Sequence, residues 1–215
     1  MVQVPVKSIC VLCGANTGSD SKYAELAKSM ALLFHKMNWR LVYGGSGRGL
    51  MAEVSRELVA LGGEVIGIKP TPFLKYEADG KLPEWGHNEL VPDLHTQKIR
   101  MAQVSDAFLF LPGGFGTLEE FSAFRMWRKL GVHSSPVLFL NFDGYYDHLL
   151  KWFSIGKEEG FISTNAAAAY TVVNTLEELP DVIQSCTFQT DEKFNLSILA
   201  PLAAEQSPDL LRSEN

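Results

Sequence analysis

The 215-residue chain has few cysteines, no surplus of positive charge and no long hydrophobic run. Three cysteines are too few for the disulfide framework of a small secreted protein. With 19 lysines and arginines against 25 aspartates and glutamates, the chain has no concentrated basic field for binding a nucleic acid. No stretch reaches the roughly 20 apolar residues of a membrane span, and the first residues show no signal-peptide cleavage pattern. We therefore expect a cytoplasmic protein that binds neither nucleic acids nor membranes.

Hydrophobic residues make up 46% of the chain, enough for one sizeable core. They gather in short continuous runs, which are typical of strands buried on both faces of a parallel sheet. The predicted strands are Lys7–Cys13, Arg40–Gly44, Glu64–Ile68, Asp106–Pro112, Pro136–Leu140 and Ala169–Val173. Amphipathic stretches between them predict helices at Asp20–Met37, Gly49–Leu61, Asp93–Val104, Thr117–Leu130, Tyr145–Glu159 and Thr175–Ser185. This alternation predicts an α/β fold with a Rossmann-like, open, mainly parallel sheet flanked by helices.

The regular alternation is interrupted at two places. Thr71–Pro92 is rich in proline and predicts a long surface excursion, a kind of loop that is usually functional or mobile. From Thr187 onward the apolar pattern fades. We therefore expect residues 1–186 to form a single Rossmann-like domain, and residues 187–215 to form a tail that is partly extended or disordered.

Three glycine-rich loops follow predicted strands and lead directly into helices. They are Cys13–Ser19, Tyr43–Met51 and Leu111–Glu120. Ligands of open α/β sheets bind beyond the carboxyl ends of the strands, where such loops present backbone N–H groups and the positive end of a helix dipole. Glycine also lets the backbone approach a phosphate closely. The three loops together predict an anionic ligand that carries phosphate.

The loops do not match two common nucleotide-binding motifs. Gly45, Gly47 and Gly49 have the wrong spacing for the dinucleotide motif G-x-G-x-x-G, and no acidic residue ends the following strand. The chain also lacks the G-x-x-x-x-G-K-[ST] motif of nucleoside triphosphatases. A mononucleotide or a sugar phosphate therefore fits the pattern better than a dinucleotide or a triphosphate.

The third loop ends in Thr117-Leu118-Glu119-Glu120, which allows two interpretations. In the structural one, Thr117 caps the helix and Glu120 bonds back to the N–H group of the cap, as in a capping box. In the functional one, Glu120 lies in the crevice and stabilises a cationic sugar, as carboxylates do when a glycosidic bond is cleaved. We favour the functional interpretation, because the same turn carries the glycines of the predicted phosphate site.

The sequence around this loop resembles the Lonely Guy family of cytokinin-activating phosphoribohydrolases. The family motif P-G-G-x-G-T-x-x-E is matched from Pro112 to Glu120, with YGGSGRGLM and VPDLHTQK upstream. The resemblance extends from about Ser8 to Ile162. It implies a Rossmann-like homodimer that hydrolyses N6-substituted adenosine 5'-monophosphates to the free base and ribose 5-phosphate, without a metal or an organic cofactor.

The resemblance also implies roles for individual residues. Glu120 is implied to be catalytic, facing the ribose and supporting positive charge at the anomeric carbon. Backbone amides of the glycine-rich loops and the Thr117 hydroxyl group are implied to hold the 5'-phosphate. The substrate-binding residues predicted in this way are Asn16, Gly45, Ser46, Gln97, Lys98, Gly113, Gly114, Gly116 and Thr117.

The chain departs from the family pattern at several positions, including Ala15-Asn16 in the first loop, and two of the departures bear on catalysis. Gln97 stands where the family carries a catalytic arginine, and Ala123 stands where members often have a further glutamate. Glutamine is neutral and offers no positive charge to a phosphate or a departing base. We predict that Arg100, one turn along the same helix, is catalytic and supplies this charge. The alternative is a diverged member that binds a nucleotide with altered substrate preference or without turnover, and the preferred base stays open.

Two further residue groups have competing interpretations. Cys10 and Cys13 lie three residues apart in a strand, so we expect them on opposite faces of the sheet as small hydrophobic residues and not as a redox pair. Phe121, Phe124 and Trp127 recur at every third position of one predicted helix. They suit either an ordinary core or an interface, where large aromatic residues are favoured. We predict that they form the interface of a homodimer.

Overall fold

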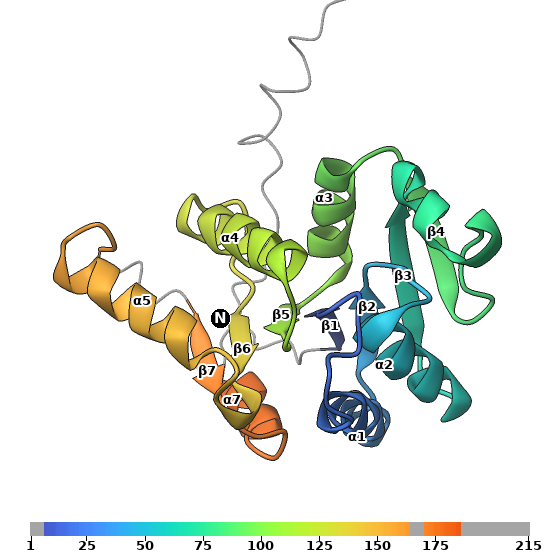
Figure 1. Ribbon diagram of the computed structural model, residues 1–215, viewed down its shortest axis with the longest axis horizontal. Helices are drawn as coiled ribbons and strands as arrows, with labels where there is room; N and C mark the ends of the chain where they lie inside the picture. The colour runs from blue at the N-terminus through green and yellow to red at the C-terminus, as the bar shows by residue number, and fades with distance from the viewer. Residues whose placement is uncertain (1–6, 164–169, 186–215) are drawn as a thin grey trace, which may run out of the picture.

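The computed structural model describes residues 7–163 and 170–185, in which seven strands form one parallel sheet (Figure 1). The strands are β1 (Ser8–Leu12), β2 (Arg40–Tyr43), β3 (Val65–Pro70), β4 (His87–Val91), β5 (Ala107–Phe110), β6 (Val137–Leu140) and β7 (Thr171–Val173). Their order across the sheet is β4-β3-β2-β1-β5-β6-β7, and every neighbouring pair is parallel. The chain moves outward from β1 to one edge and then from β5 to the other, as in Rossmann-like folds. The predicted fold class is confirmed.

Helices cover both faces of this sheet. The α-helices are α1 (Lys22–Met37), α2 (Gly49–Ala60), α3 (Leu94–Val104), α4 (Phe115–Lys129), α5 (Asp147–Glu158) and α7 (Leu179–Ser185). Short 3-10 helices are η1 (Thr71–Tyr76), η2 (Ala78–Gly80) and η3 (Phe142–Gly144). In Figure 1, α3 and α4 lie above the sheet and α1 and α7 lie below it. None of the helices in the described part of the chain is long and apolar enough to span a membrane.

Side chains of β1 alternate between two hydrophobic clusters, one on each face of the sheet. Val11 and Cys13 belong to the cluster covered by α1, α2 and α7, whereas Cys10 and Leu12 belong to the cluster covered by α3, α4 and α5. Cys10 and Cys13 are buried free cysteines. They pack on opposite faces, as their spacing predicted, and this placement excludes a disulfide between them.

The predicted surface excursion contains a strand that the sequence analysis missed. Residues His87–Val91 form β4, which pairs in parallel with β3 at the edge of the sheet. Its side chains are mostly exposed or half-buried, because an edge strand with one open side does not require a continuous apolar run. The polar residues His87, Asn88 and Glu89 therefore concealed the strand in the sequence.

The aromatic series on α4 belongs to the core. Phe121, Phe124 and Trp127 are each at most 8% exposed. Phe124 stacks on Phe108 of β5 with ring centroids 4.1 Å apart, and the Phe121 ring lies 4.4 Å from that of Phe139 on β6. The prediction that this series forms a dimer interface is wrong, because the helix face that carries it covers the sheet of its own chain. The homodimer itself stays a prediction.

Further differences from the predicted elements lie toward the end of the chain. The helix expected at Thr175–Ser185 begins at Leu179. The strand expected from Ala169 begins at Thr171, and Ala169 itself lies outside the described residues. The predicted tail, residues 187–215, also lies outside them, so the division of the chain near residue 186 stays a prediction.

Candidate functional site

The three glycine-rich loops meet at the carboxyl edge of the sheet, where β1 and β5 lie side by side. The chain leaves these two strands toward opposite edges, and such a switch point opens a crevice between the loops that follow. Hydrogen bonds join the loops: Gly14 N donates to Pro112 O, and Leu50 N donates to Gly14 O, both at 3.1 Å. A cavity of about 870 Å³ opens here, a volume typical of a small-molecule site. The loops thus converge on one site, as predicted.

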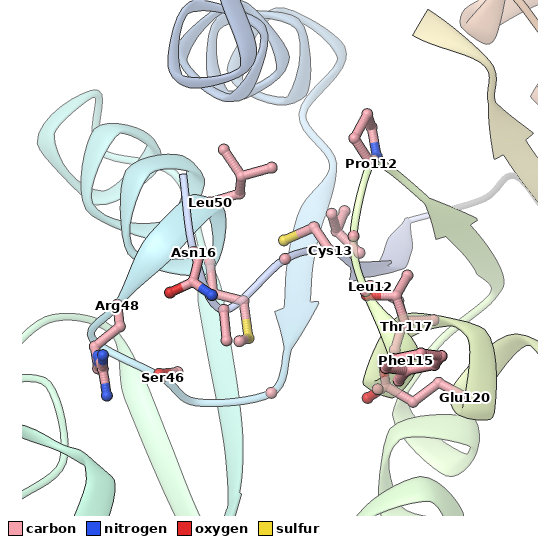
Figure 2. Close-up of a pocket in the computed structure, with 18 of the residues that line it drawn as sticks. Leu12, Cys13, Asn16, Ser46, Arg48, Leu50, Pro112, Phe115, Thr117 and Glu120 are labelled. Atoms are coloured by element: carbon pink, nitrogen blue, oxygen red, sulfur yellow. The ribbon is translucent and has the colours of Figure 1, made fainter. Parts of the chain in front are cut away.

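Most of the predicted site residues line this cavity. They are Asn16, Ser46, Gln97, Gly113, Gly114, Gly116, Thr117 and Glu120. Figure 2 shows Ser46 and Arg48 on one side of the cavity and Glu120 on the opposite side. Three predicted residues are absent from the lining of this cavity: Gly45, Lys98 and Arg100.

The third loop presents the first turn of α4 to the cavity. The helix begins at Phe115 with Gly114 as its N-cap, so Thr117 lies inside the first turn and is not the cap. The capping-box alternative, which we did not favour, is therefore excluded, because the helix begins at Phe115, earlier than the sequence pattern indicated. A Cβ on Gly113 would lie 2.1 Å from the Thr117 hydroxyl oxygen, so only glycine lets that hydroxyl group sit over the loop. The first-turn N–H groups have no acceptor within the helix and can bind an anion.

Glu120 follows Thr117 by three residues on α4 and is half-buried at the cavity wall (Figure 2). Among the described residues, none forms a hydrogen bond with its carboxyl group. Burial, and to a lesser degree the neighbouring Glu119 carboxylate, raise the pKa of Glu120 to about 8, against the opposing charge of Lys98. A partly desolvated carboxyl group without a protein partner, facing a cavity, is typical of a functional residue.

The raised pKa of Glu120 predicts a pH-dependent stability. The ordinary pKa is 4.5, so between 4.5 and about 8 the folded protein keeps this proton while the unfolded chain loses it. The contribution of this proton to the free energy of unfolding is therefore complete below pH 4.5 and is lost as the pH rises through about 8. We expect the free energy of unfolding of the wild type, relative to Glu120→Gln, to fall between about pH 5 and pH 9. Urea denaturation at both pH values measures this difference, and a difference that does not change with pH would contradict it.

Two of the predicted binding residues, Lys98 and Gly45, do not line the cavity. Lys98 is buried on α3, and its ammonium group donates to the Glu119 carboxylate, so it does not reach the cavity. Gly45 adopts a φ of +64°, and a Cβ there would lie 3.0 Å from the Lys69 Cβ and 3.2 Å from the backbone of β3. Gly45 thus makes a tight turn against β3 and does not itself face the ligand space.

Gln97 lines the cavity from the first turn of α3 and is buried. Its amide nitrogen donates to Ile68 O at 2.5 Å and lies 3.5 Å from Gly44 O. The N–H groups of the Gln97 side chain are therefore directed at backbone carbonyl groups near the carboxyl ends of β2 and β3. The neutral amide ties α3 to these strands and brings no charge to the cavity.

The structure contradicts the prediction that Arg100 supplies this charge. Its guanidinium group donates twice to the Glu89 carboxylate, from Nε at 2.7 Å and from a terminal nitrogen at 3.0 Å. Glu89 lies on β4, the edge strand that the sequence analysis missed. Residues three apart on a helix lie only roughly on one face, and this two-point contact holds Arg100 on the β4 side of α3. Arg100 is a structural residue here.

The structure also places residues at the cavity that sequence analysis missed. A buried ion pair joins Lys69, at the end of β3, to Glu77, which follows η1. A lysine in an otherwise apolar strand was the one pattern that could have revealed it. The Tyr145 hydroxyl group donates to Gly113 O at 2.7 Å and braces the third loop. Arg48 lines the cavity and donates to Tyr76 O at 3.1 Å.

The fold and the site together define a Rossmann-like α/β protein with a cavity at its topological switch point, lined by three glycine-rich loops. Residues 51–183 match the family described as "Possible lysine decarboxylase". The chain is 43% identical over 171 residues to cytokinin riboside 5'-monophosphate phosphoribohydrolase LOG4 of Arabidopsis thaliana, covering 80% of this chain and 79% of that protein. It belongs to the Lonely Guy (LOG) family.

Other comparisons agree on family and fold. The probable cytokinin riboside 5'-monophosphate phosphoribohydrolase LOG4 of Oryza sativa subsp. japonica is 39% identical over 81% of this chain and 75% of that protein. Among solved structures, the molybdenum cofactor binding protein of Rippkaea orientalis aligns with a TM-score of 0.62 at 18% identity, covering 83% of this chain and 96% of that one. The molybdenum cofactor carrier protein of Chlamydomonas reinhardtii aligns with a TM-score of 0.62 at 16% identity, covering 84% and 97%. At these identities the two structures are evidence of a shared fold alone.

Proposed function

We propose that this protein hydrolyses the N-glycosidic bond of a cytokinin-type, N6-substituted adenosine 5'-monophosphate, and releases the free base and ribose 5-phosphate. The observation that carries the proposal is the arrangement on α4, where the first-turn N–H groups, the Thr117 hydroxyl group and the Glu120 carboxyl group face one cavity. The names of the curated relatives support the substrate class. We also propose that the protein acts as a cytoplasmic homodimer.

The spacing of these groups suits a ribose 5-phosphate. Residues three apart on a helix are neighbours, with Cβ atoms roughly 5–6 Å apart, so Thr117 and Glu120 form a pair of adjacent contacts. A 5'-phosphate on the first turn of α4 therefore brings the sugar against Glu120. Binding energy from the phosphate serves to orient the anomeric carbon for the reaction.

Glu120 then stabilises the transition state. As the bond from the anomeric carbon to the base nitrogen breaks, its electron pair leaves with the base, and the sugar gains oxocarbenium character. In its ionised form, which the raised pKa makes dominant only above about pH 8, the Glu120 carboxylate stabilises the positive charge, and the half-buried environment strengthens the interaction. Water adds to the anomeric carbon and loses a proton, while the departing base gains one. The products are the free base and ribose 5-phosphate.

A second candidate function is nucleotide binding without turnover. The observation that favours it is Gln97, whose neutral amide is engaged with Ile68 O at the cavity wall. A site without a cation at this position binds a nucleotide but gives less help to a departing base.

Ribose 5-phosphate release separates these two functions. We expect the purified wild type, incubated with AMP or isopentenyl-adenosine monophosphate, to release ribose 5-phosphate and free base, with the substituted nucleotide as the better substrate. Chromatography of the base and an enzymatic assay of the sugar phosphate measure the reaction. The matched variant is Gln97→Arg. A wild type that binds both nucleotides without turnover, alongside an active Gln97→Arg variant, would contradict the hydrolase and support the binding protein.

A further inference from the structure

The loop after β2 holds a set of donors suited to a phosphate group. Its Ser46 hydroxyl group and Gly47 N–H group point to the same place as the Lys69 ammonium group, which reaches over from the end of β3. Ser46 and Lys69 are 4% and 6% exposed, and both line the cavity. A backbone N–H, a hydroxyl and an ammonium group around one point are the groups by which proteins hold phosphate oxygens.

The protein fills this position with a carboxylate of its own. Glu77 accepts from the Ser46 hydroxyl group at 2.6 Å, from Gly47 N at 2.8 Å and from the Lys69 ammonium group. Burial acts to raise its pKa, but these three donors outweigh burial and hold the pKa of Glu77 below its ordinary value. Glu77 is therefore an anion at neutral pH, and its charge cancels that of Lys69.

The loop after β5 is different. Within residues 7–163 and 170–185, no side chain accepts from the first-turn N–H groups of α4. A Cβ placed on Gly114 or Gly116 would meet no heavy atom within 4 Å, so the space beside these residues is open. The cavity thus has two loops that present donors, one occupied by the Glu77 carboxylate and one open. Figure 2 shows Ser46 of the first loop and Thr117 after the second on opposite sides of the cavity.

We propose that Glu77 determines how a phosphate ester binds, by occupying the donors of the loop after β2 and leaving the first turn of α4 as the phosphate site. A ligand then enters in one orientation, with its phosphate on α4. Glu77 also holds the η1 segment against the loop after β2, because its carboxylate accepts from Ser46 and Gly47 of that loop. The proposal takes its ligand class, a phosphate monoester, from the proposed function.

The test on the wild type uses inorganic phosphate and the backbone amide resonances of two glycines. On titration in a ¹⁵N-resolved NMR spectrum, we expect the Gly116 resonance to shift and the Gly47 resonance to stay in place. Thr117→Val is expected to weaken phosphate binding about tenfold or more, the usual effect of losing a hydrogen bond to a charged group. A Gly47 resonance that moves with the same affinity as that of Gly116 would overturn the proposal.

The second test removes the carboxylate. Glu77→Ala leaves the Ser46, Gly47 and Lys69 donors free, so calorimetry with inorganic phosphate is expected to find two sites where the wild type has one. Glu77→Gln keeps the shape of the side chain and removes only its charge. It is expected to show a weaker second phosphate site, and it tests the proposal if the alanine variant does not fold. Glu84→Ala removes an exposed carboxylate from the same excursion and is expected to keep one site. A single site in both folded Glu77 variants would overturn the proposal.

These outcomes are independent of turnover. A protein that binds phosphate only on α4 but releases no ribose 5-phosphate would remove the hydrolase and leave the role of Glu77 intact. A protein that hydrolyses the nucleotide while the Gly47 resonance follows phosphate binding would retain the hydrolase and remove the role of Glu77.

Discussion

Replacing Glu120 with glutamine is expected to lower kcat for hydrolysis at least about 100-fold, the usual scale for a positioned catalytic carboxylate. Glutamine keeps the length and shape of the side chain, but it cannot ionise, so it never carries the negative charge that stabilises an oxocarbenium-like sugar. Nucleotide binding is expected to persist, because the phosphate contacts on the first turn of α4 do not involve this group. Steady-state kinetics, together with calorimetry of nucleotide binding, measure the two effects separately.

The matched control for this variant is Glu119→Gln. Glu119 is the neighbouring residue, and its carboxylate is about half exposed and paired with Lys98. Its replacement removes an equivalent carboxyl group from the same helix, and we expect less than a tenfold change in kcat because an exposed carboxylate is screened by solvent. Near-full activity of Glu120→Gln, with an unchanged melting temperature, would show that Glu120 has no catalytic role. Equal losses in the two variants would show that the general charge of α4, and not the position of Glu120, matters.

Replacing Gly49 with alanine is expected to disrupt the close backbone contact between the first two glycine-rich loops. Gly49 begins α2 with a φ of +59°, and a Cβ there would lie 2.3 Å from the carbonyl carbon of Ala15 and 2.4 Å from Asn16 N. The overlap is with backbone atoms, so the Cys13–Ser19 loop must move away from α2. We expect the free energy of unfolding to fall by about 3 kcal/mol or more, and phosphate binding to weaken in the protein that remains folded. Urea denaturation and phosphate calorimetry measure these two quantities.

Gly62→Ala separates backbone strain from steric overlap. Gly62 also has a positive φ, +82°, but an added Cβ there meets no heavy atom within 4 Å. Its replacement is therefore expected to lower the free energy of unfolding only by the strain of a positive φ on a residue with a Cβ, about 1–2 kcal/mol. Equal destabilisation by the two variants would show that the contact between Gly49 and the first loop is unimportant.

The Lys69–Glu77 pair shows how a cavity can contain a buried lysine whose charge is cancelled by a carboxylate of the protein itself. A buried ion pair is weak evidence for stability, because the desolvation of both charges offsets their attraction. The pair also accepts hydrogen bonds from Ser46 and Gly47, so it links η1 to the loop after β2. Its position at the ligand cavity, not in the core, is what points to a role in ligand orientation.

The sequence by itself determined the sheet and the place of the cavity. Strands covered by helices on both faces are buried along their length, so each of the central strands had to be a continuous apolar run. Glycine is needed wherever the backbone approaches a phosphate closely, so the three loops were visible from composition and spacing. The proximity of Glu120 to the third loop also followed from the sequence, because three residues along a helix is a short and predictable distance.

Only the tertiary structure decided what each side chain of the site contacts. Arg100 binds Glu89 because an edge strand, polar and therefore hidden in the sequence, lies beside α3. The loop after β2 is occupied because Glu77 lies 30 and 31 residues beyond its donors, in a segment without periodicity. Phe124 faces the core because α4 lies flat on the sheet. Each of these contacts joins residues of different helices, strands or loops, and local sequence patterns describe only the neighbours of a residue along its own helix or strand.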